Sequence, residues 1–160
     1  MTVSTEADIL IAGVGHPLMG DDSLGLEVIR KLEEIGPLDR TRLFYAGASP
    51  LDILGELAGI KKLIIVDALT GIGPGEIIKQ QYGSHQSELH MNEVVTHGIG
   101  LVQTLSLAQE LHPGIEIIVI GAGIEPAAAP GTSLTQALSE RIPELIQLIE
   151  EEIAAAKLHS

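Results

Sequence analysis

The chain has 160 residues, 45% of them hydrophobic and 19% charged, a composition typical of one globular domain with a substantial core. Nine basic and 22 acidic residues give a net charge of −13, which disfavours nucleic acid and anionic membranes as partners. The sequence has no cysteine, which excludes disulfides, thiolate metal ligands and a cysteine nucleophile.

The first half of the chain alternates strand and helix patterns. Residues 8–15 form a short run rich in Ile and Val, typical of a strand that is buried on both faces. Residues 23–35 place apolar side chains at helical spacing and end at a Gly-Pro pair. Residues 40–46 alternate as expected of a strand nearer a sheet edge, and residues 49–59 begin with Ser-Pro, which favours the start of a helix.

The second half of the chain continues the same alternation. Residues 62–69 and 115–124 are apolar on both faces and predict two more buried strands, whereas residues 75–81 alternate and predict a strand nearer an edge. Residues 96–111 and 132–157 predict helices, and Pro143 is expected to divide the second of these into two pieces.

This order of elements predicts the fold class. We expect a single α/β domain over residues 1–160, with a mostly parallel, twisted five-stranded sheet sandwiched between helices. No apolar run approaches the roughly 20 residues that a transmembrane helix needs, and the N-terminal residues lack the basic segment of a signal peptide. Together with the lack of cysteine, these features predict a cytoplasmic protein.

Acidic and histidine side chains gather where strands of such a sheet end. His16, Asp21 and Asp22 follow the first strand pattern, Asp67 directly follows the residues "LIIV" of the third, and His97 heads a later helix. Ligands of open α/β sheets bind outside the carboxyl ends of the strands. Two carboxylates and an imidazole from three separate segments can therefore meet at one place.

Each of these residues also has a purely structural interpretation. Asp21 or Asp22 suits the N-cap of the helix that follows, and a single histidine such as His97 is more often a hydrogen-bonded structural residue. Asp67 can simply open a turn, but an ionised carboxylate at a buried strand is costly unless it is paired. The nearest lysines in the sequence lie at the opposite end of that strand, so a cation is the simplest partner for Asp67.

A phosphate-binding loop is the main alternative at the first strand end. The segments "GVGHPL" (13–18) and "GAGIEP" (121–126) begin as G-x-G but lack the third glycine, and two carboxylates at the helix start would repel a pyrophosphate. The sequence also lacks a Walker A motif, the nucleophile elbow of a serine hydrolase and the H-E-x-x-H helix of a zinc protease. A nucleotide-binding or phosphate-binding domain with an atypical loop stays open as a second hypothesis.

Two carboxylates and one imidazole at a solvent-accessible edge suit a borderline divalent ion such as nickel, zinc or iron. A site with so few ligands leaves coordination positions vacant. From the residues alone we therefore predict an open metal-contacting site at the carboxyl edge of the sheet.

Several segments resemble those of a known family. "GVGHPLMGDDSLG" (13–25) resembles the opening G-x-G-N-x-x-x-x-D-[DE]-x-x-G of the nickel–iron hydrogenase maturation endopeptidases. Five further segments resemble later blocks of that family in the same order: "GASPLDIL" (47–54), "LIIVDAL" (63–69), "GPGEI" (73–77), "THGIGL" (96–101) and "IGAGIEP" (120–126). The resemblance spans nearly the whole chain, and it is specific through the order and spacing of the blocks.

The resemblance implies a function and a set of site residues. Members of this family remove a C-terminal peptide from the precursor of the hydrogenase large subunit after nickel has been inserted. They contact the nickel through an acidic residue of the first loop, an aspartate after the third strand and a histidine of the later loop. By motif position these are Asp22, Asp67 and His97 in this sequence, and all three are among the residues that the strand-end pattern brings together.

This sequence departs from the family pattern at three places. The family usually has Asn where this chain has His16, which either adds a metal ligand or proton donor or replaces the hydrogen bonds of the Asn. It often has Gly at Ser23, a change that a negative φ would allow. In several relatives an acid precedes the second block where this chain has Ala46, so no role of that acid is carried over.

The resemblance further implies that the nickel belongs to the substrate and is not permanently bound, and we expect zinc or cadmium to substitute for it in vitro. Two routes to peptide hydrolysis stay open. Either the metal polarises the carbonyl or a water, or a carboxylate such as Asp21 or Asp22 acts as general base. A nickel-binding maturation chaperone without peptidase activity is the third hypothesis.

Overall fold

The computed structural model describes residues 7–16, 20–83, 95–96, 100–124 and 134–158. In chain order the elements are β1 (Ile9–Val14), η1 (Gly20–Ser23), α1 (Leu24–Ile35), β2 (Thr41–Gly47), η2 (Pro50–Glu56), β3 (Lys62–Thr70), β4 (Ile77–Tyr82), β5 (Val95–Thr96), α3 (Leu101–Leu111), β6 (Glu116–Gly123), α4 (Gln136–Ser139) and α5 (Ile142–Leu158), where η denotes a 3₁₀ helix.

All five predicted strands are present, in the spatial order β2-β1-β3-β6-β4. Strands β2, β1, β3 and β6 run parallel, and β4 is antiparallel to β6, so the sheet is mostly parallel as predicted. The two alternating runs form the edge strands of this path, as their patterns indicate. The sequence did not predict β5, a two-residue strand that pairs antiparallel with the end of β3.

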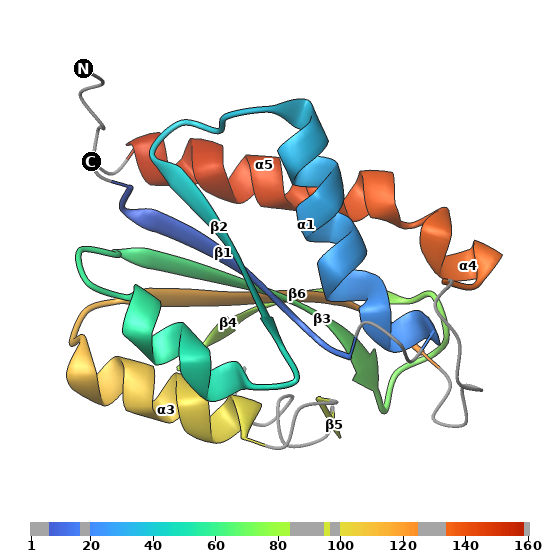
Figure 1. The fold of residues 1–160 in the computed structure, drawn as a ribbon, viewed down its shortest axis with the longest axis horizontal. Coiled ribbons are helices and arrows are strands. Elements are labelled where there is room, and N and C mark those ends of the chain that lie inside the picture. Colours follow the sequence, from blue (N-terminus) through green and yellow to red (C-terminus); the bar gives the residue numbers. More distant parts are fainter. Residues whose placement is uncertain (1–6, 17–19, 84–94, 97–99, 125–133, 159–160) are drawn as a thin grey trace.

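Helices cover both faces of the sheet (Figure 1). α1 and α5 lie over one face, and α3 and η2 lie over the other. The buried side chains accordingly form two clusters, because alternate residues of each strand point to opposite faces. In β3, Ile64 and Val66 pack toward α1 and α5, whereas Leu63 and Ile65 pack toward α3 and η2. The three-layer α/β fold predicted from the sequence is confirmed.

Two helical segments differ in detail from the prediction. Residues 49–59 contain a 3₁₀ helix, η2, with Pro50 in its first turn. The C-terminal helical segment is divided as predicted, because α4 ends at Ser139 and α5 starts at Ile142, which places Pro143 in the first turn of α5, where the missing N–H costs nothing. In the part of the chain that is described, no helix is long and apolar enough to cross a membrane.

Candidate metal-contacting active site

The first turn of α1 packs directly on the sheet backbone. A Cβ atom on Gly25 would lie 2.4 Å from the carbonyl oxygen of Val14 and 2.9 Å from that of Val66. A Cβ atom on Gly13 would likewise lie 2.7 Å from the carbonyl oxygen of Gly25. Only glycine permits so close an approach of a helix to two strands. The approach brings η1, which carries Asp21 and Asp22, into contact with β3.

The loop that leaves β1 is also fixed at its start. The N–H of Gly15 donates to the carbonyl oxygen of Gly47 at 2.9 Å, and the hydroxyl of Tyr45 donates to the carbonyl oxygen of Gly15. His16 follows directly and is half-buried. Ser23 has φ −83°, so the departure from the glycine common in the resembled family causes no backbone strain.

Asp67 lies inside β3 and is fully buried. In agreement with the predicted strand 62–69, β3 continues past Asp67 to Thr70, because β6 and β5 pair with it beyond Val66, the last residue that pairs with β1. Alternate residues of a strand point to the same face of the sheet, so Asp67 lies on the same face as Leu63 and Ile65. This is the face that α3 and η2 cover.

The residue of β6 that faces Asp67 in the register is a glycine. A Cβ atom on this residue, Gly121, would lie 2.4 Å from the carbonyl oxygen of Asp67, which is closer than real Cβ contacts come. Gly121 therefore lets β6 continue beside β3 at the level of the aspartate. This glycine belongs to the motif "IGAGIEP" of the sequence analysis.

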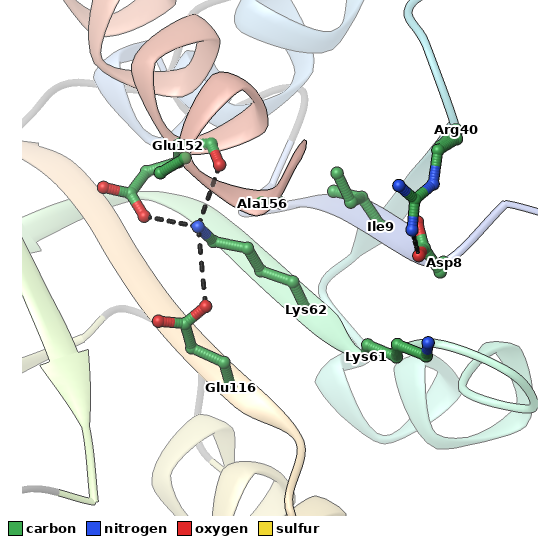
Figure 2. A pocket seen from close by; sticks show the side chains of 9 residues that line it. Asp8, Ile9, Arg40, Lys61, Lys62, Glu116, Glu152 and Ala156 are labelled. Carbon is green, nitrogen blue, oxygen red and sulfur yellow. Dashed lines mark hydrogen bonds and ion pairs between the residues drawn. The ribbon is translucent and has the colours of Figure 1, made fainter. Parts of the chain in front are cut away.

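The lysines of β3 are at the other end of the strand, as the sequence indicated. Lys62 is buried there, and its Nζ lies 2.7 Å from Oε1 of Glu152 and 3.5 Å from Oε1 of Glu116 (Figure 2). These side chains line a cavity of about 230 Å³. Asp67 lies five residues further along the strand than Lys62, a distance of about 16 Å. Lys62 is therefore committed to Glu152 and Glu116 and does not neutralise Asp67.

β5 pairs with the end of β3 that lies beyond Asp67. β5 ends at Thr96, whose partner in the antiparallel register is Leu69, two residues beyond Asp67. His97 itself lies outside the described residues, as does the first turn expected for the helix at 96–111. The described part of that helix, α3, begins at Leu101 on the face to which Asp67 belongs.

Asp21 has a structural partner that the sequence did not indicate. It is 8% exposed; its Oδ1 accepts a hydrogen bond from the N–H of Thr135 at 2.7 Å, and its Oδ2 accepts one from the Thr135 hydroxyl at 3.1 Å. The structural interpretation that Asp21 or Asp22 is the N-cap of the next helix is wrong, because the N-cap residue of α1 is Ser23. The carboxylate of Asp21 instead binds the N-cap residue of the distant α4. The 114 residues between the partners explain why no local pattern revealed the pair.

Of the predicted site residues, the described structure places Asp67 in β3 and gives the backbone of Asp22 in η1. η1 contacts β3, and β5 pairs with the end of β3 beyond Asp67. The side chains of Asp22 and His97 are outside the described part. Within that part, no group of three or more acidic or histidine side chains is positioned to hold a metal ion.

A model of one protein family matches residues 26–152, and its description is hydrogenase maturation protease. The chain belongs to the hydrogenase maturation proteases. This confirms the family resemblance, and the matched range includes Asp67 and His97. Because the first loop precedes this range, the assignment of Asp22 rests on the motif at 13–25.

Two curated relatives cover almost the whole chain. A Methanocaldococcus jannaschii protein assigned as a hydrogenase maturation protease is 36% identical to this chain and covers 91% of it and 96% of the relative. The coenzyme F420 hydrogenase subunit delta of Methanothermobacter thermautotrophicus is 29% identical and covers 95% of this chain and 98% of the relative.

Solved structures confirm the fold of this maturation protease. The nickel–iron hydrogenase maturation protease HybD of Thermococcus kodakarensis matches with a TM-score of 0.77 at 23% identity, covering 91% of this chain and 98% of that one. The hydrogenase maturating endopeptidase HybD of Escherichia coli matches with a TM-score of 0.76 at 24% identity, covering 92% and 93%. As a member of this family the protein is a peptidase.

Proposed function

We propose that this peptidase removes the C-terminal extension from the precursor of a nickel–iron hydrogenase large subunit in the cytoplasm, and that the nickel already inserted in the precursor is the recognition element. Membership of the hydrogenase maturation proteases supports the substrate class. The single structural observation that supports the nickel contact is Asp67, a fully buried carboxylate at the carboxyl edge of the sheet, where ligands of such folds bind.

In this proposal Asp22, Asp67 and His97 together contact the nickel of the precursor. Two carboxylate oxygens and one imidazole nitrogen are a donor set that suits nickel, and also zinc and cadmium as substitutes in vitro. Three protein ligands leave room for those of the precursor. His16, half-buried after β1, is a candidate for a fourth contact from this chain.

Hydrolysis requires a water oxygen to add to the scissile carbonyl carbon, the carbon–nitrogen bond to break and the leaving nitrogen to gain a proton. Two routes fit the proposed site. In the first, the precursor's nickel polarises the carbonyl or the water. In the second, a first-loop carboxylate accepts the proton of the water. Asp22 suits the second route better than Asp21, because both oxygens of Asp21 accept hydrogen bonds from Thr135.

The direct test incubates the purified chain with a candidate hydrogenase precursor, loaded with nickel or free of metal, and follows the products by intact mass. We expect a shortened large subunit and a released peptide only from the loaded precursor. D22N is expected to lose this cleavage, whereas D52N, a change of an exposed aspartate on η2, is expected to keep it. Equal cleavage with and without nickel would contradict the proposed recognition.

A second candidate function is a non-catalytic nickel-sensing chaperone. One curated relative, which is similar to this chain over 95% of its length, is named as a hydrogenase subunit and not as a protease. This similarity favours the chaperone as a second candidate. This candidate predicts nickel-dependent binding to the precursor without a shorter product. The same incubation therefore distinguishes the two functions.

A further inference from the structure

The contact between Asp21 and Thr135 joins the first loop to a remote helix. Thr135 is the N-cap residue of α4, and its side chain accepts a hydrogen bond from the N–H of Leu138 at 3.5 Å while its hydroxyl donates to Asp21 at 3.1 Å. Leu138 is 1% exposed and belongs to the core cluster of α1 and α5. Asp21 is therefore attached, through Thr135, to a rigid part of the core.

A second hydrogen bond fixes the shape of η1 itself. The hydroxyl of Ser23 is buried and donates to the carbonyl oxygen of Gly20 at 2.6 Å, which closes the 3₁₀ turn. In a 3₁₀ helix successive side chains leave about 120° apart, because there are three residues per turn. Holding the carboxylate of Asp21 against Thr135 therefore also fixes the rotation of η1 about its own axis.

The chemistry of the contact favours orientation over proton transfer. A carboxylate that accepts two donors from one residue is held in both position and rotation, and charge-assisted hydrogen bonds are about twice as strong as neutral ones. A general base must instead turn an oxygen toward a water and carry away its proton. Asp21 is also 8% exposed, which leaves little surface for a water to approach.

We propose that Asp21 is a positioning residue, which sets the orientation of Asp22 toward the metal by anchoring η1 to Thr135 at the start of α4. This rests on the proposed function, in which Asp22 contacts the nickel of the precursor. Mutation of a residue that hydrogen-bonds to a metal ligand and orients it typically lowers metal affinity or activity by about 10- to 100-fold.

The test compares D21N, T135V, T135S and the double variant D21N/T135V with the wild type. Three quantities are measured: cleavage of nickel-loaded precursor, affinity of the free chain for cadmium by calorimetry, and the thermal unfolding midpoint. We expect D21N to lower both kcat/KM and cadmium affinity by about 10- to 100-fold. T135V keeps the backbone N–H donor, so we expect its kcat/KM and cadmium affinity to fall only about 3- to 10-fold. T135S keeps the hydroxyl, so we expect both quantities to stay within about twofold of the wild type.

The double variant identifies the mechanism. If Asp21 acts through Thr135, D21N/T135V is expected to be no worse than D21N, since the two changes remove one interaction. A loss of more than about 1,000-fold in kcat for D21N, with T135V at the wild-type rate, would overturn the proposal in favour of a general base. Wild-type cleavage and cadmium affinity in D21N, with only a lower unfolding midpoint, would also overturn it.

The same assays separate this proposal from the proposed function. If the wild type cleaves without regard to nickel but D21N and D22N lose cadmium affinity in parallel, the proposed function fails and the positioning role stands. If D22N keeps full cadmium affinity, the positioning role fails, because Asp21 then has no metal contact to orient. A wild-type chain that neither cleaves nor binds cadmium overturns both.

Discussion

Gly25 in α1 and Val66 in β3 are in backbone contact: a Cβ atom on Gly25 would lie 2.9 Å from the carbonyl oxygen of Val66 and 2.4 Å from that of Val14. This contact sets the distance between the helix that follows the first loop and the strand that carries Asp67. Any side chain at position 25 must push the helix away from the sheet. The packing of one glycine therefore controls the geometry of the proposed site.

We expect G25A to be destabilised by about 3 kcal/mol, because a methyl group overlapping backbone atoms cannot be relieved by rotating a side chain. It is also expected to lose cleavage in the remaining folded protein, since η1 is displaced from β3. Urea unfolding and cleavage of nickel-loaded precursor measure the two effects. The control is G55A on η2, where a Cβ atom meets nothing within 4 Å; a similar loss in G55A would mean that the effect is not due to this packing.

D67N tests the charge of the buried aspartate with little change of shape. We expect kcat/KM for nickel-loaded precursor to fall at least about 100-fold, as for loss of a metal contact. Stability is expected to stay within about 1 kcal/mol of the wild type or to rise, because a buried amide is cheaper to desolvate than a carboxylate. D52N is the matched control on an exposed surface. Unchanged cleavage in D67N would remove Asp67 from the proposed site.

His97 is expected to be needed for the nickel-dependent step. H97A removes the nitrogen ligand and should lower cleavage of the loaded precursor by at least about 100-fold. H112A is the matched control, because His112 caps the far end of α3. Both variants are assayed by intact mass at equal protein concentration. Full cleavage by H97A would remove the histidine from the proposed site.

The ion pairs at the amino end of β3 predict a pH dependence of stability that is separate from activity. Burial alone would raise the pKa of Glu152. The hydrogen bonds from Lys62 and Lys79, together with their positive charges, outweigh this effect, so the pKa of Glu152 is lowered from its ordinary value of 4.5. A group with a lowered pKa stabilises the fold above its unfolded pKa and loses this contribution as pH falls through the folded value.

We therefore expect E152Q to lose about 2–3 kcal/mol of unfolding free energy at pH 7, because Lys62 is left buried with weaker partners. The difference between wild type and E152Q should narrow as pH falls from about 5 to about 3. Urea unfolding across this range measures it, with E151Q, a change of the exposed neighbour, as control. A difference that does not depend on pH would contradict the assignment of this ion pair.

The strands and the layer order were predictable from the sequence because they follow from local patterns. The Ile- and Val-rich runs fixed the buried strands, and the family motifs placed Asp22, Asp67 and His97. The predicted strand 62–69 agrees with β3 to within one residue, whereas β5, which pairs with the end of β3, could not be predicted because two residues are too few to carry a local pattern. Thr135 was missed because its contact with Asp21 is set by how α4 packs, not by any nearby residue.

The location of a bound metal tests the central proposal most directly. Crystals of the chain grown with cadmium or nickel would be measured at the absorption edge of the metal, so that its position is identified by anomalous scattering. We expect one metal about 2.0–2.5 Å from carboxylate oxygens of Asp22 and Asp67 and from an imidazole nitrogen of His97. A metal bound elsewhere, with any of these three side chains directed away from the others, would contradict the proposed site.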